Sequence, residues 1–120
     1  MPTTVIAKTA AEFAEKLRID LTVVGPEVPL SLGIADEFAK RELPIFGPTR
    51  LAAQIETSKA FAKEFYARHD IATAAAEICS TAEEARAALH RFGYPAVLKA
   101  DGLAGGKGVL TLESTEDAEK

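Results

Sequence analysis

The stretch VLKADGLAGGKGVLTL (Val97–Leu112) places four glycines and two lysines between two apolar runs. The flanking residues, Ala96–Leu98 and Val109–Leu112, are predicted to be strands, so the segment is predicted to form a β-hairpin with a glycine-rich loop. Glycines let backbone N–H groups approach phosphate oxygens closely, and lysines supply positive charge. The pattern indicates a polyphosphate site, with a plain flexible hairpin carrying solvated lysines as the alternative.

The loop departs from two common phosphate-binding motifs. In the pattern G-x-x-x-x-G-K-[ST], the first glycine position holds Asp101, and Gly108 stands where Ser or Thr would reach magnesium. The dinucleotide pattern G-x-G-x-x-G fails because Ala104 stands at its second glycine. Both motifs also open a helix, whereas a strand is predicted to follow this loop. The loop therefore reads as a flap that can lie over a nucleotide.

The rest of the chain alternates short apolar runs with amphipathic stretches. Strands are predicted at Thr4–Ala7, Leu21–Val24, Pro44–Phe46 and Ala72–Ile78. Helices are predicted to open at Thr9, to span Leu30–Arg41 and Thr49–His69 with a break near Thr57–Ser58, and to open at Ser80 and after Ser114. This alternation predicts an α/β fold in which helices join parallel strands. A boundary between two structural units is expected around Pro48–Ser58.

Helical periodicity predicts which side chains form the core. The expected apolar stripes are Phe13, Ala14 and Leu17; Leu30, Ile34 and Phe38 with Ala35; Phe61, Ala62, Phe65 and Tyr66; and Ala82, Ala85, Leu89 and Phe92. The spacing of Ser80 to Glu83 is that of a capping box.

The composition of the chain disfavours several classes of function. The chain has 120 residues, of which 48% are hydrophobic and 27% charged, with a net charge of −4. This acidic balance disfavours nucleic-acid binding. The single cysteine, Cys79, excludes an internal disulfide and fits a reducing compartment. No apolar run approaches the roughly 20 residues that span a bilayer, and Met1–Thr4 carries no signal-peptide pattern. We expect a cytoplasmic protein without nucleic-acid or membrane partners.

A second candidate site lies at Gly25-Pro26-Glu27, directly after a predicted strand. Ligands of open α/β sheets bind at the carboxyl ends of strands, where Glu27 could accept hydrogen bonds from sugar hydroxyls. The alternative is an exposed turn glutamate. His69, His90 and Cys79 lack neighbours at ligand spacing and are expected to be surface or structural residues.

Four segments together resemble one family. They are DLTVVGPEVPLSLGIADEF (Asp20–Phe38), IFGPT (Ile45–Thr49), SKAFAKEFYARH (Ser58–His69) and VLKADGLAGGKGV (Val97–Val109). Their order and spacing resemble those of the phosphoribosylamine–glycine ligases, also called glycinamide ribonucleotide synthetases, of the ATP-grasp superfamily. The resemblance covers about Asp20 to Lys120 and is weaker before Asp20.

The resemblance implies an ATP-dependent ligase that joins 5-phosphoribosylamine and glycine in de novo purine biosynthesis. It implies that ATP phosphorylates the glycine carboxylate and that the amine then attacks the acyl phosphate, which releases ADP and phosphate. A carboxylate is a poor electrophile until a phosphate makes its oxygen a leaving group, and magnesium and lysines offset the phosphate charge. The implied partners are small molecules, and a monomer is expected for the full-length enzyme.

The resemblance also implies roles for single residues. Lys59 matches the first nucleotide-binding lysine of the family and Lys99 the second. The loop that closes over the triphosphate of ATP matches Gly102, Leu103, Gly105, Gly106, Lys107 and Gly108. Gly25 and Glu27 match a turn that faces the phosphoribosylamine. The family commonly has alanine where Gly105 stands, a change expected to add flexibility without abolishing phosphate binding.

The implied fold is the end of a Rossmann-like pre-ATP-grasp domain, residues 1–57, joined to the flap-bearing α+β start of an ATP-grasp domain, residues 58–120. The catalytic segments and the ligands for Mg²⁺ or Mn²⁺ are expected outside these residues. The chain then resembles an internal fragment, and the isolated chain is expected to be inactive. The alternatives are a stand-alone nucleotide-binding module without catalysis and a truncated product without independent function.

Overall fold

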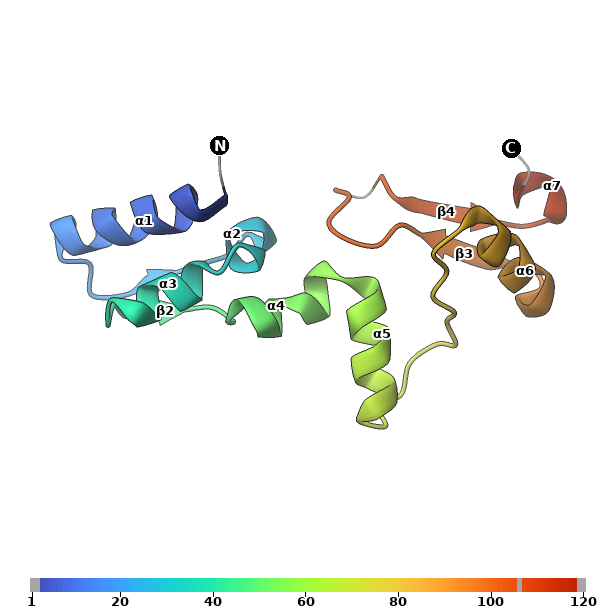
Figure 1. Cartoon of the computed structure of the whole chain (residues 1–120), viewed down its shortest axis with the longest axis horizontal. Helices are drawn as coiled ribbons and strands as arrows, with labels where there is room; N and C mark the ends of the chain where they lie inside the picture. Colours follow the sequence, from blue (N-terminus) through green and yellow to red (C-terminus); the bar gives the residue numbers. More distant parts are fainter. Residues whose placement is uncertain (1–2, 106, 119–120) are drawn as a thin grey trace. The chain divides into compact units, whose positions relative to one another are not determined.

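The computed structural model describes residues 3–105 and 107–118 of the chain. The chain divides into two compact units, Met1–Ala62 and Lys63–Lys120. Both units contain helices and strands, coloured from blue to red along the sequence in Figure 1. The predicted α/β class is confirmed.

The first unit contains a short parallel sheet. Strand β1 (Thr22–Val23) pairs with β2 (Ile45–Phe46), and Thr22 lies opposite Ile45. The N–H of Thr22 donates to the carbonyl oxygen of Pro44, and that of Val24 donates to Phe46, both at 3.1 Å. The two predicted strands and their parallel pairing are therefore confirmed.

Four helices build the core of this unit: α1 (Thr3–Leu17), α2 (Glu27–Ser31), α3 (Ile34–Lys40) and α4 (Arg50–Thr57). Helix α1 contacts α3, and α2 contacts α4. The core cluster consists of Ala7, Ala11, Ala14, Leu30, Ile34, Phe38 and Ala53. The predicted stripe of Leu30, Ile34 and Phe38 is confirmed, and Phe38 is only 1% exposed.

Two predictions for the region of helix α1 are wrong. Thr4–Ala7 is not a strand and Thr9 does not open the helix, because one helix runs from Thr3 to Leu17. The predicted face is also wrong at two residues, since Phe13 is 62% and Leu17 52% exposed. Three alanines spaced by four and three residues, 7, 11 and 14, form the buried face instead, and their small size lets α1 approach its neighbours closely.

The single helix predicted over Leu30–Arg41 is two helices. Between α2 and α3, Gly33 adopts φ of 81°, a left-handed conformation that L side chains rarely adopt. Its N–H donates to the Leu30 carbonyl at 2.9 Å, and its own carbonyl accepts from Glu37 at 3.0 Å. Gly33 therefore ends one helix and begins the next without losing backbone hydrogen bonds.

Arg41 links the end of α3 to α1. Its guanidinium lies 3.1 Å from Glu37, 3.1 Å from Glu15 and 3.6 Å from Glu12. The hydrogen bond to Glu37, helped by the one to Glu15, raises the pKa of Arg41 above its ordinary value. A raised pKa of a cation contributes stability that is lost only when the pH rises through it, so this contribution is constant near neutral pH.

The long helical tract breaks where the sequence predicted. Helix α4 ends at Thr57, and α5 (Lys59–Arg68) follows Ser58. The hydroxyl oxygen of Thr49 accepts from Ala52 N at 3.3 Å, and that of Ser58 accepts from Phe61 N at 3.1 Å. Both hydroxyls thus act as helix caps, which confirms the predicted break.

The second unit contains the predicted hairpin. Strand β3 (Ala96–Lys99) pairs antiparallel with β4 (Val109–Leu112), and Lys99 lies opposite Val109. Helix α6 (Ala82–Phe92) precedes the hairpin, and α7 (Thr115–Ala118) begins directly after Ser114, as predicted. Among the described residues beyond Ala62, the buried hydrophobic ones are Ala88 and Leu112.

Three predictions for this unit are wrong. Ala72–Ile78 forms no strand. The capping box joins Thr81 and Glu84 rather than Ser80 and Glu83, because the helix begins one residue later than the pattern indicated. On α6, Ala82 and Phe92 are exposed while Ala85 and Leu89 are half-buried, so the predicted stripe covers only the middle of the helix.

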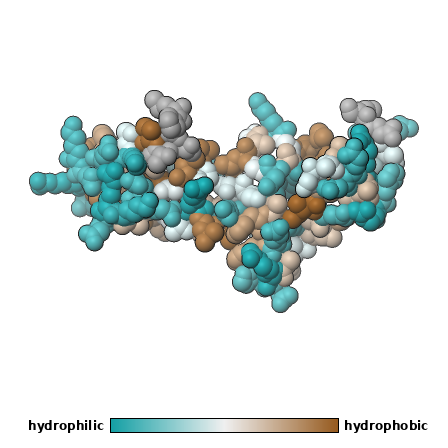
Figure 2. All heavy atoms as spheres, in the orientation of Figure 1, coloured by the Kyte–Doolittle hydropathy of each residue, from teal (hydrophilic) through white to brown (hydrophobic). Residues whose placement is uncertain are grey.

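Apolar side chains reach the surface in both units, and Figure 2 shows them as brown areas. On the parallel sheet, Val23 is 66% and Phe46 70% exposed. Parallel sheets are normally covered on both faces, so this face has the character of an interior surface. Among the described residues, no helix is long and apolar enough to cross a membrane.

Candidate functional site

The glycine-rich loop, residues 100–108, joins β3 to β4 (Figure 1). At its base the N–H of Ala100 donates to the Gly108 carbonyl at 2.7 Å, which extends the hairpin by one pair. Nearer the tip, the N–H of Lys107 donates to the Ala104 carbonyl at 3.0 Å. One backbone hydrogen bond thus closes the loop at its base, and the other closes a turn within the loop.

At three positions of the loop the backbone conformation or the lack of space favours glycine. Gly102 and Gly105 have φ of 87° and 55°, where L side chains are strained. At Gly108, a Cβ atom would lie 2.9 Å from the Cβ atoms of both Ala100 and Ala104. Gly106, also predicted to bind ATP, lies outside the described residues.

One lysine precedes this loop and a second lies within it. Lys99 ends β3, Lys107 lies near the end of the loop, and both side chains are exposed. Because side chains alternate across a sheet, Lys99 shares a face with Val97, which is 54% exposed. Leu103 adds an exposed apolar side chain within the loop. Ammonium groups beside exposed apolar surface can bind a ligand that combines a polyphosphate with an apolar ring.

Lys59 belongs to the first unit and is the first residue of α5, directly after the cap Ser58. Its side chain is half-buried. Backbone N–H groups of a first turn and a lysine at the same position both favour an anion.

Gly25, Pro26 and Glu27 form the connection from β1 to α2. No atom would meet a Cβ at Gly25 within 4 Å, so its backbone is open to a ligand. Pro26 is the N-cap of α2 in an extended conformation, and Glu27 is the exposed first residue of the helix. The structure therefore places Gly25 and Glu27 together at the carboxyl end of a parallel strand.

A second Gly-Pro pair ends β2, and its importance was missed from the sequence. A Cβ at Gly47 would lie 2.9 Å from Leu30 Cδ2 and 3.6 Å from Val24 Cβ. Gly47 thus allows α2 to pack closely against the sheet. The repetition of Gly-Pro after both strands, at Gly25 and Gly47, was the signal that could have indicated it.

His69 and Cys79 are among the residues expected to be surface or structural. His69 packs its ring against that of Phe65, with centroids 4.3 Å apart. Cys79 is a half-buried free thiol. In residues 3–105 and 107–118, no group of three or more His, Cys, Asp or Glu side chains could hold a metal ion.

Family models match almost the whole chain. The model of the phosphoribosylglycinamide synthetase N domain matches residues 2–56, and that of the ATP-grasp (A) domain of the same family matches residues 57–120. The chain belongs to the phosphoribosylglycinamide synthetase family. The ATP-grasp fold of its second part implies ATP binding.

Curated and solved relatives agree with this family. The phosphoribosylamine–glycine ligase of Vibrio vulnificus is 55% identical over 108 residues, which cover 90% of this chain and 25% of that protein. The crystal structure of the phosphoribosylamine–glycine ligase of Thermotoga maritima is 37% identical, with a TM-score of 0.69 over 91% of this chain and 26% of that one. The chain spans about a quarter of the length of the relatives it matches.

A more distant structure shares the fold alone. The biotin carboxylase domain of the 2-oxoglutarate carboxylase of Hydrogenobacter thermophilus, crystallised with MgADP, is 22% identical with a TM-score of 0.79. The aligned region covers 94% of this chain and 26% of that domain's chain.

Proposed function

We propose that this chain is part of an ATP-dependent ligase that joins 5-phosphoribosylamine and glycine to glycinamide ribonucleotide in purine biosynthesis. The observation that carries the proposal is the glycine loop of the β3–β4 hairpin, with Lys99 before it and Lys107 within it, in a chain of this family. The isolated 120-residue chain is expected to be inactive, because its relatives are about four times as long.

In this proposal the loop holds the phosphates of ATP. The loop from Gly102 to Gly108 closes over the phosphates, and Lys59, Lys99 and Lys107 offset their charge. The glycine carboxylate takes the terminal phosphate of ATP, and the amine of phosphoribosylamine then displaces phosphate from the acyl carbon. Gly25 and Glu27 face the phosphoribosylamine, where the carboxylate of Glu27 accepts hydrogen bonds from ribose hydroxyls.

Further parts of the proposal concern the full-length protein. Mg²⁺ or Mn²⁺ offsets phosphate charge, held by ligands outside this chain. The enzyme is a cytoplasmic monomer that binds neither nucleic acid nor membranes. The domain boundary lies between residues 57 and 58, which the change from one family model to the other at residues 56 and 57 supports.

The test uses the full-length protein from the native cell. Its intact mass should be several times that of this 12.7 kDa chain, and it should release ADP only when glycine and phosphoribosylamine are both present. Lys99→Met should weaken MgATP binding by roughly 10- to 100-fold, since a charge-assisted hydrogen bond contributes about 1.5–3 kcal/mol. Lys8→Met, at an exposed position of α1, is the matched control and should leave the affinity unchanged.

The outcomes separate the proposal from its alternative. A folded full-length protein without glycine-dependent ADP release would overturn the ligase. MgATP binding that depends on Lys99 without such turnover would instead favour a nucleotide-binding module. Equal MgATP affinities of Lys99→Met and Lys8→Met would remove Lys99 from the site.

A further inference from the structure

The connection from α5 to α6 has no regular secondary structure. Residues 69–81 form neither helix nor strand, and each residue from Ile71 to Ile78 is exposed. The N–H of Ile71 donates to the Tyr66 carbonyl at 2.9 Å, which anchors only the start of the segment. All of its residues belong to the second unit, together with the hairpin that carries the glycine loop.

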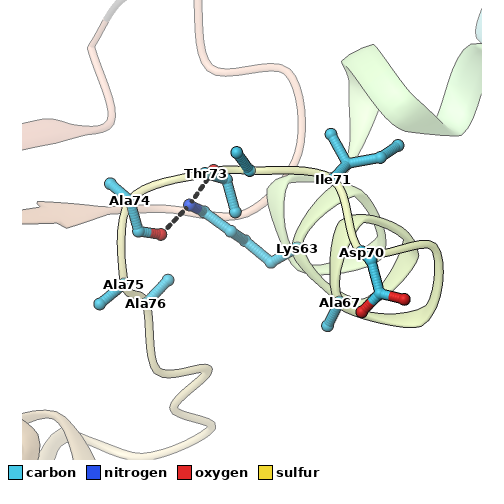
Figure 3. Close-up of a pocket in the computed structure, with 9 residues that line it drawn as sticks. Lys63, Ala67, Asp70, Ile71, Thr73, Ala74, Ala75 and Ala76 are labelled. Carbon is cyan, nitrogen blue, oxygen red and sulfur yellow. Dashed lines mark hydrogen bonds between the residues drawn. The ribbon is translucent and has the colours of Figure 1, made fainter.

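Lys63 of α5 holds the middle of this segment. Its Nζ donates to the Thr73 hydroxyl oxygen at 2.7 Å and to the Ala74 carbonyl oxygen at 2.6 Å. Figure 3 shows the lysine side chain reaching from α5 to these two acceptors, while the Asp70 carboxylate points elsewhere. One ammonium group thus contacts both a side chain and the backbone of the segment.

A pocket of about 400 Å³ lies between the segment and α5. Its walls include Lys63, Asp70 and Thr73, and the other wall residues are mostly alanines. The hydrogen bonds of Lys63 reach Thr73 and Ala74 beside this space, and the residues from Ala72 to Ala76 are all exposed. The position of the segment therefore depends on polar contacts rather than on a core.

A second cation holds the far end. The Arg91 guanidinium of α6 forms an ion pair with the Glu77 carboxylate. The segment is thus fastened to α5 through Lys63 and to α6 through Arg91. Without Lys63, the unfastened stretch would extend from Ile71 to Glu77, and a longer free connection has more conformations to lose when it is ordered.

We infer that Lys63 is a positioning residue that fastens Thr73 and Ala74 to α5 and keeps the connection to the glycine-loop hairpin ordered for nucleotide binding. The nucleotide part of this inference rests on the proposed function. When only a fraction of molecules has the ordered connection, the apparent affinity falls by that fraction. Lys63 therefore acts on ATP affinity through Thr73 and Ala74, without contact to the nucleotide.

The test uses the full-length protein and two readouts. Elastase cleaves after small residues, so its cleavage rate within Ala72–Ala76 reports how often the segment opens. Lys63→Met should accelerate cleavage about tenfold and raise the Kd of MgATP about three- to tenfold. Thr73→Val removes one acceptor and should give a smaller increase in both.

Two controls make the result specific. Arg86→Met removes an exposed charge from α6 in the same unit and should change neither readout. Adding Thr73→Val to Lys63→Met should have no further effect, because the hydrogen bond is already lost. If Lys63→Met does not fold, Thr73→Val and Arg86→Met decide the question alone.

The cleavage rate and the MgATP affinity together decide whether Lys63 fastens and positions the segment. Faster cleavage together with weaker MgATP binding supports the inference. Unchanged cleavage in Lys63→Met overturns the fastening, and faster cleavage with unchanged MgATP affinity overturns the positioning role. A wild-type protein that binds MgATP but forms no product with glycine contradicts the proposed ligase and leaves both comparisons valid.

Discussion

The two units of this chain differ in the extent of their buried cores. In Met1–Ala62 a continuous cluster of buried side chains joins α1, α2, α3 and α4, and Phe38 is its largest fully buried member. In the described part of Lys63–Lys120, the buried hydrophobic residues are Ala88 and Leu112, and Lys63, Thr81 and Arg91 make polar contacts. Polar contacts and left-handed glycines occur in both units, as Arg41 and Gly33 show in the first, so the units differ mainly in how many side chains pack into a core.

The largest expected effect tests the first half of this comparison. Phe38→Ala should lower the free energy of unfolding by about 3–5 kcal/mol, because the side chain is 1% exposed and would leave a cavity. Phe13→Ala, at a position 62% exposed, is the matched control and should cost less than about 1 kcal/mol. Urea unfolding followed by circular dichroism measures both changes.

Hydrogen exchange adds a second readout to the same pair. In Phe38→Ala, amide protection should fall in α1 and α3 but not in β3 and β4, because Phe38 belongs to the core cluster of the first unit and the hairpin belongs to the second. Equal loss of protection in both units would break the comparison.

An intermediate effect is expected at the loop glycines. Gly108→Ala should destabilise the hairpin by about 1–3 kcal/mol, because the new methyl group would lie 2.9 Å from Ala100 and Ala104 and force the loop to move. Gly105→Ala meets no atom within 4 Å and should cost about 1–2 kcal/mol at most, from its φ of 55° alone. Exchange rates of the β3–β4 amides measure the difference, and a larger cost at Gly105 would contradict the steric explanation.

The smallest expected effect concerns one helix cap. Thr81→Ala should cost about 1 kcal/mol, because the Thr81 hydroxyl oxygen accepts from Glu84 N at 3.1 Å and this bond begins α6. Ser80→Ala should cost a few tenths of a kcal/mol at most, since Ser80 contributes its backbone N–H to Glu84 rather than its hydroxyl. Thermal unfolding ranks the two variants, and the opposite ranking would favour the capping box originally predicted from Ser80.

The sequence predicted those parts of the fold that depend on local chemistry. The hairpin around Lys99 and Val109, the break at Ser58 and the stripe of Leu30, Ile34 and Phe38 follow from turn residues, a hydroxyl cap and helical periodicity. Each of these signals lies within a few residues of the feature that it specifies.

The wrong predictions concern segments whose secondary structure depends on contacts with residues distant in the sequence. Val5 and Ile6 suggested a strand, but the alanine face of α1 packs against distant residues and the helix continues through them. Ala72–Ile78 has the composition of a weak strand but no strand beside it in the described structure.

The candidate site divides in the same way. The loop and its two lysines were recognisable from composition and spacing. The close approaches at Gly47 and Gly108 and the hydrogen bond from Lys63 to Ala74 depend on how the chain folds back on itself, which composition and spacing did not predict. The functional roles of the site residues remain predictions that Lys99→Met and Lys63→Met test.

The buried face of α1 has a consequence for how this protein can evolve. Its three buried residues, Ala7, Ala11 and Ala14, bring only methyl groups to the interface. Any replacement except glycine or serine adds volume and drives α1 away from α3, while glycine weakens the helix itself. Larger hydrophobic side chains strengthen many interfaces, but they would therefore disrupt the interface between α1 and its neighbours. Its sequence is constrained by the smallness of its side chains.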